Sequence, residues 1–137
     1  MNLAPRLILL HKQSSSARTR FLRFPHGLVA FAALSEQSSL RPADDAAVRH
    51  HPAAVVRDAE ERLALPPGSI EAVTDFHAEV DTPEGMVPVL LAGFTTVDPP
   101  FAAAENLGGK FIAITEARGV PAIDLELARR AYEVVLG

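Results

Sequence analysis

The sequence predicts an α/β (α+β) fold in which helices accompany a β-sheet, and three observations support this class. Apolar runs of strand length alternate with segments of helical periodicity along the chain. Residues 69–97 have the pattern of a long β-hairpin. The segment that starts at Asp124 has the apolar stripe of a C-terminal helix. Because 137 residues suffice for one hydrophobic core, we assign residues 1–137 to a single domain.

Two apolar runs near the N-terminus are predicted to be strands. Residues 6–10 read RLILL, as expected for a strand buried on both faces. Residues 27–34 form a second run, predicted to be a strand because it contains Val29 and Phe31, although its alanines also permit a helical turn. Residues 13–20 are predicted to be a polar connection. Nearby arginines could face an anion from an extended chain, although a solvated loop is favoured. They are Arg18, Arg20 and Arg23.

Residues 53–65 predict an amphipathic helix. It should begin at or just before Pro52, because proline suits the first helical turn, and residues 66–68 (PPG) should end it. The helical period places Asp58 and Glu61 on one side and the apolar residues on another. Those apolar residues are Val55, Val56, Ala59 and Leu63.

The hairpin is predicted from its alternation and its turn. Residues 69–81 are mostly apolar at even positions and mostly polar at odd ones, residues 82–85 form the turn, and residues 86–97 return as an apolar strand. Pro88 lacks a backbone N–H, so it should lie near the start of the return strand or face an unpaired edge.

The C-terminal third completes the predicted order of elements. A short helical turn should close at Gly108 and Gly109, and residues 110–115 should form a further strand. Asp124 is predicted to cap the last helix. Its buried stripe should consist of Leu127, Ala131, Val134 and Val135.

Composition excludes several classes of protein. Thirteen basic against seventeen acidic residues give a net charge of −4, so we expect neither nucleic acid nor a membrane as a partner. The absence of cysteine excludes disulfides, thiolate zinc sites and a cysteine nucleophile. The apolar run near the N-terminus is too short for a signal peptide or a membrane span, and the expected location is cytoplasmic. Neither a phosphate-binding loop, a dinucleotide fingerprint nor a G-x-S-x-G elbow occurs.

The predicted helix and its flanks resemble the box of the Nudix superfamily, which reads G-x5-E-x7-R-E-U-x-E-E-x-G-U, where U is a bulky aliphatic residue. Arg57 matches the arginine, Asp58 stands at the first glutamate of the R-E pair, and Ala59 stands at the aliphatic position. Glu61 matches the first glutamate of the E-E pair, and Leu65 matches the closing aliphatic residue.

Besides Asp58, which replaces a glutamate, four positions depart from this box. Arg62 stands where the second glutamate of the E-E pair is expected, and Ala64 stands where the glycine is expected. Upstream, the first glycine falls on Ala43 and the loop glutamate falls on Arg49. The match is therefore to a degenerate Nudix box.

The resemblance implies a Nudix-like α/β/α sandwich with a mixed sheet, a long β-hairpin and a C-terminal helix. It also implies a Mg²⁺-dependent pyrophosphohydrolase that acts on a nucleoside-diphosphate-linked compound, a small nucleotide-type ligand. In this hypothesis Asp58 and Glu61 bind Mg²⁺, and Arg57 and Glu61 are the catalytic residues, with Arg57 orienting the carboxylates. Activity would be low or atypical, because Asp58 is one methylene shorter than glutamate.

The alternative hypothesis is a catalytically inactive Nudix-like module for binding or assembly. It is motivated by the missing loop glycines, the missing loop glutamate and Arg62. Here Arg62 pairs with Asp58 and Arg57 pairs with Glu61, each four residues apart on the helix, and these pairs replace a metal site. The apolar residues 86–97 and the Phe101 region could also form a homodimer.

Further polar residues could extend a site in this fold. His77, Glu79 and Asp81 share one strand face and could bind a metal, although a solvated face is favoured. The adjacent His50 and His51 are interpreted as surface or capping residues, because metal ligands on a helix are three or four residues apart. Other candidates are Glu105 and the group Thr115, Glu116, Arg118 and Gly119, which could equally be a turn.

Overall fold

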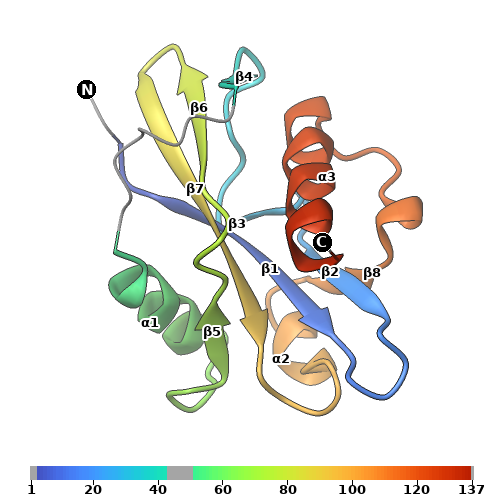
Figure 1. Ribbon diagram of the computed structural model, residues 1–137. Coiled ribbons are helices and arrows are strands. Elements are labelled where there is room, and N and C mark those ends of the chain that lie inside the picture. Colours follow the sequence, from blue (N-terminus) through green and yellow to red (C-terminus); the bar gives the residue numbers. More distant parts are fainter. Residues whose placement is uncertain (1–2, 43–50, 137) are drawn as a thin grey trace.

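The computed structural model describes residues 3–42 and 51–136 (Figure 1). Within these residues, the strands are β1 (Arg6–Lys12), β2 (Thr19–Arg23), β3 (Val29–Ala30), β4 (Ser39–Leu40), β5 (Ile70–Ala72), β6 (Ala78–Thr82), β7 (Gly85–Phe94) and β8 (Lys110–Ile112). The helices are α1 (Ala53–Arg62), α2 (Phe101–Glu105) and α3 (Ala122–Leu136), with a 3₁₀ turn η1 (Ile114–Glu116). None of these helices is long and apolar enough to cross a membrane.

All eight described strands belong to one mixed sheet, as the sequence predicts for an α+β fold. The main path runs β4-β6-β7-β1-β2-β8, while β3 pairs with β1 and β5 pairs with β7. β1 and β7 are parallel, with Leu7 opposite Leu90, and the other pairs are antiparallel. Pairing of β1 and β7 at the centre of the sheet explains why both strands are apolar on both faces.

Helices cover both faces of this sheet (Figure 1). On one face, α1 and α2 bury Ala59, Leu63 and Ala104 against the sheet residues Leu7, Leu9, Leu22, Ile70, Leu90, Ala92 and Phe94. On the other face, α3 buries its predicted stripe, with Val134 and Val135 only partly covered. The sheet residues there are Ile8, Leu10, Phe21, Val29, Ala78, Val80, Val87, Val89, Leu91 and Ile112, and Phe76, which lies between β5 and β6, packs with them.

The predicted strand over residues 69–81 is in fact two strands. β5 pairs with the end of β7, where Ile70 lies opposite Phe94, and β6 pairs with its beginning, where Ala78 lies opposite Val89. In β5, Ala72 lies opposite the even-numbered Ala92 of β7, whereas in β6, Ala78 lies opposite the odd-numbered Val89. Even-numbered residues therefore change sides of the sheet between β5 and β6. Ile70 therefore packs beneath α1, whereas Phe76 packs beneath α3. The predicted turn is confirmed, because Thr82 pairs with Gly85.

Three other expectations were wrong. The connection predicted over residues 13–20 is shorter, because β2 starts at Thr19 and is paired on both edges. Of residues 27–34, only Val29–Ala30 is a strand. Asp124 lies inside the first turn of α3 rather than capping it. The box positions Ala43 and Arg49, and His50, lie outside the described residues.

The end of α1 has the backbone form that favours glycine. Ala64 has φ +54°, its N–H donates to Glu61 O at 3.0 Å, and the N–H of Leu65 donates to Glu60 O at 2.8 Å. This is a Schellman motif, in which the left-handed residue is usually glycine. The Nudix box has its glycine at this position.

Replacing Ala64 with glycine should stabilise the protein. We expect a gain of about 1 kcal/mol in the free energy of unfolding, because glycine adopts a positive φ without a steric cost and the exposed Ala64 methyl packs little. Urea unfolding measures this difference. Ala54→Gly, at an exposed site within α1, should instead lose about 0.5–1 kcal/mol. Equal effects at both positions would contradict the prediction.

Candidate functional site

Asp58 and Arg62 form the ion pair that the alternative hypothesis predicts. They are one turn apart on α1, and Arg62 Nε donates to Asp58 Oδ2 at 2.9 Å. Both side chains are about half exposed, at 54% and 56%. The pair is therefore worth little to stability, but it orients both groups.

Arg57 and Glu61, the predicted catalytic residues, are exposed on α1. Within the described residues they form no ion pair with each other or with Asp58. The structure therefore does not bring Glu61 and Asp58 together with a third carboxylate. Across the described residues, no group of three histidine or acidic residues could hold a metal ion.

A cavity of about 300 Å³ lies beside α1, next to the start of β1. Its polar side chains are Arg6, Asp58 and Arg62. The remaining lining residues are Ala4, Pro5, Leu7, Ala30, Phe31, Ala32 and Val55. This cavity thus combines two guanidinium groups with one carboxylate.

Both arginines of this cavity are held by neighbouring groups. Arg6 Nη1 donates to Ala32 O at 2.7 Å and to Ala33 O at 3.3 Å, which ties β1 to the segment after β3. The guanidinium carbon of Arg62 lies 5.1 Å from the centre of the Phe31 ring, which is a cation–π distance. Arg62 is therefore positioned by both Asp58 and Phe31.

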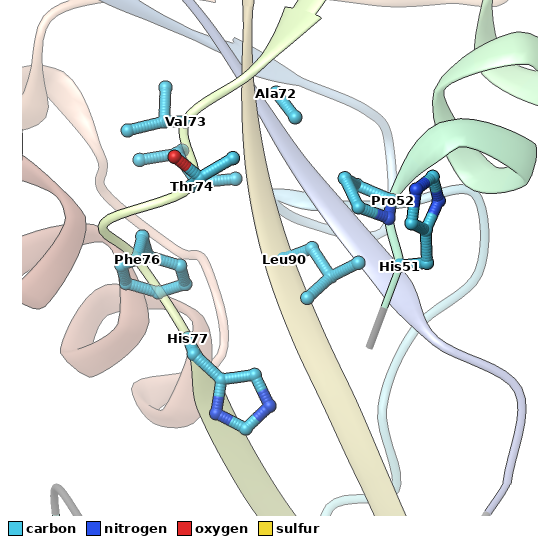
Figure 2. Close-up of a pocket in the computed structure, with 9 residues that line it drawn as sticks. His51, Pro52, Ala72, Val73, Thr74, Phe76, His77 and Leu90 are labelled. Carbon is cyan, nitrogen blue, oxygen red and sulfur yellow. The ribbon is translucent and has the colours of Figure 1, made fainter. Parts of the chain in front are cut away.

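A second cavity, of about 400 Å³, opens beside the segment that separates β5 from β6. Figure 2 shows Leu90 of β7 between the start of α1, with His51 and Pro52, and the chain that carries Phe76 and His77. The lining is mainly apolar, with Ala72, Val73, Thr74 and Leu91 completing it. His51 Nδ1 accepts a long hydrogen bond of 3.4 Å from the N–H of Ala53. His51 is exposed, which agrees with the surface or capping role predicted for it.

Other acidic residues that could have completed a metal site are bound elsewhere. Arg41 donates to both oxygens of Asp81 at 2.9 Å and lies 3.9 Å from Glu79 Oε2. The Arg41 guanidinium lowers the pKa of the Asp81 carboxyl through this hydrogen bond. Glu116 Oε1 accepts from the N–H of Ala113, so its segment is a turn.

Glu60 was not predicted to have a role, although it is buried with 6% of its surface exposed. Its Oε2 accepts from the N–H of Gly68 at 2.8 Å and from that of Ile70 at 3.1 Å. A signal was available, because Val56, Glu60 and Leu63 share the helical spacing of the buried stripe. Arg6 was also missed, and no local pattern indicates its role.

The arrangement can bind an anion more readily than a metal. Mg²⁺ takes oxygen ligands in an octahedral shell, and Asp58 is the single carboxylate of the α1 cavity, where it is already paired with Arg62. These residues do not fit a Mg²⁺ site. No protein-family model matches the chain, and no curated protein matches it.

Proposed function

We propose that this chain is a Nudix-like domain, an α/β/α sandwich, that binds a phosphate-bearing, nucleotide-type small molecule without metal-dependent hydrolysis. The order of strands and helices, the C-terminal helix and the left-handed backbone at Ala64 support the Nudix-like part. Asp58 and Glu61, which would have been metal ligands, lie on the box-like helix α1.

The observation that carries the loss of hydrolysis is the position of Arg62. Its guanidinium stands at the place of an expected metal-ligating glutamate and is hydrogen-bonded to Asp58 at 2.9 Å. A positive charge there opposes a divalent cation, and it also occupies an oxygen that the cation would need. The hydrolase hypothesis, with Arg57, Asp58 and Glu61 acting on Mg²⁺, requires this pair to break.

Arg62→Glu tests this proposal, because it restores the glutamate of the box. We expect the substitution to raise the affinity for Mn²⁺ by at least about tenfold, since a cation is replaced by an oxygen ligand beside Asp58. Isothermal calorimetry of a titration with Mn²⁺ measures this change in affinity. Arg57→Glu is the matched control, because it makes the same charge change on the same helix outside the cavity.

The unmodified chain should release no phosphate from a panel of nucleoside-diphosphate-linked compounds with Mg²⁺ or Mn²⁺. Phosphate release that requires metal and is abolished in Glu61→Gln would overturn the proposed loss of hydrolysis. Equal gains of Mn²⁺ affinity in Arg62→Glu and Arg57→Glu would show that Arg62 does not block a site.

A further inference from the structure

The structure assigns a metal-independent binding site for a phosphate or diphosphate group to Arg6 and Arg62, in the cavity beside α1. This inference rests on the proposed function, because it identifies where and how the ligand of that function is held. The two guanidinium groups come from elements far apart in the sequence, the start of β1 and the end of α1, and they line one cavity.

Arg6 is anchored at one end of this cavity. Its Nη1 is used by the carbonyls of Ala32 and Ala33, and the side chain is partly buried. A guanidinium group carries five N–H donors in a fixed plane, so anchoring through Nη1 leaves donors on Nε and Nη2. Holding the side chain in place reduces the entropy lost when an anion binds.

Arg62 is oriented from two sides. Nε is bound to Asp58, and the guanidinium lies over the Phe31 ring. Neither Nη atom of Arg62 donates a hydrogen bond to another described residue. These two nitrogens are therefore the donors that a ligand oxygen could reach.

The charges of the cavity favour an anion. Arg6 and Arg62 give two positive charges against the one negative charge of Asp58. Guanidinium groups bind phosphate oxygens through paired, charge-assisted hydrogen bonds. A volume of about 300 Å³ lies at the small end of the range for ligand pockets, so the cavity suits a phosphate or diphosphate group rather than a whole dinucleotide.

A metal-binding role and an arginine-pairing role for Asp58 predict opposite effects of Asp58→Asn on the affinity for a phosphate ligand. If Asp58 bound a metal, Asp58→Asn would weaken the metal-dependent binding of a phosphate ligand. In the arginine site, Asp58 competes with the ligand for Arg62 and repels it, so Asp58→Asn should tighten binding. The sign of this change separates the two chemistries.

The test is calorimetric titration of the full chain with inorganic diphosphate in EDTA, which removes divalent metals. We expect binding to the unmodified chain, a loss of about tenfold or more in Arg62→Gln, and a gain of about threefold in Asp58→Asn. Arg57→Gln and Glu61→Gln are matched controls on exposed positions of α1 that do not line the cavity, and their affinities should change by less than about twofold. Inorganic phosphate should bind more weakly than diphosphate, and acetate should not compete at equal concentration.

Three results would overturn the inference. These are no binding of diphosphate in EDTA, an equal loss in Arg62→Gln and Arg57→Gln, and weaker binding in Asp58→Asn. Either of the first two results would show that Arg62 does not form a specific site for diphosphate. The third would show that Asp58 contributes favourably to binding. Metal-dependent phosphate release that is lost in Glu61→Gln would instead overturn the proposed function. The titration in EDTA would still test the site at Arg6 and Arg62 independently, because it contains no metal.

Discussion

Replacing Asp124 with alanine should lower the free energy of unfolding by about 3 kcal/mol. Only 1% of the surface of Asp124 is exposed, and its Oδ2 accepts the N–H of Leu28 at 2.9 Å. Alanine would leave a buried N–H without an acceptor, which costs about 1–3 kcal/mol, and would add a cavity beneath α3. Chemical denaturation of both proteins measures the difference.

The same carboxylate should make stability depend on pH. Burial raises the pKa of Asp124, an effect that the hydrogen bond from the N–H of Leu28 opposes. Because the folded protein holds this proton more tightly than the unfolded chain, the contribution of Asp124 is largest below its ordinary pKa near 3.8 and is lost as pH rises through the folded pKa. Asp124→Asn, which keeps an acceptor but cannot ionise, should therefore gain stability relative to the unmodified protein as pH rises from 4 to 7.

Glu126→Ala is the control for both measurements, because Glu126 is an exposed acid in the same helix. Its effect should stay within about 0.5 kcal/mol at every pH. A stability difference between Asp124→Asn and the unmodified protein that is constant over this pH range would contradict the role of burial. An alanine variant as stable as the unmodified protein would contradict the role of the Leu28 contact.

The elements that could be predicted from sequence are those decided by local spacing. The helical period of Val55, Val56, Ala59 and Leu63 was sufficient to place α1 and its buried side, and Pro52 marked its start. The turn of the β6–β7 hairpin was predictable for the same reason, since Pro83, Glu84 and Gly85 separate two apolar runs. Local pattern therefore identified the box-like helix and the β6–β7 hairpin.

The interruption between β5 and β6 could not be predicted from the alternation of apolar and polar residues. Even positions are mostly apolar from Ile70 to Val80, and this pattern is the same whether the strand is continuous or changes its exposed side midway. The difference depends on which part of β7 each half pairs with. It therefore needs long-range contacts that one sequence does not reveal.

The candidate site was predicted in part, for a related reason. Asp58 and Arg62 are four residues apart, so their ion pair follows from the helix alone. Arg6 reaches the same cavity only because β1 lies beside β3, which places the carbonyls of Ala32 and Ala33 within its reach. The predicted homodimer through residues 86–97 is untested. Residues 86–94 have less need of a partner than expected, since β7 is paired along both edges and buried by the chain itself. Val97 and Phe101 remain exposed.

Replacing Glu60 with alanine should also lower the free energy of unfolding by about 3 kcal/mol. The Glu60 carboxylate joins α1 to the start of β5 through the N–H groups of Gly68 and Ile70. Hydrogen bonds to a charged acceptor contribute about 1.5–3 kcal/mol, and the buried N–H of Ile70 would lose its acceptor. Urea unfolding measures the loss, and the slope of the free energy against urea concentration should be the same in both proteins.

Glu61→Ala is the matched comparison, because it removes the same group from the next residue of α1. Glu61 is exposed and has no ion pair within the described residues, so the change should stay within about 0.5 kcal/mol. Equal losses in the two variants would contradict the structural role of Glu60. A large difference would show that the two neighbouring glutamates have different roles. Glu60 would then hold the helix to the sheet, and Glu61 would take no part in this contact.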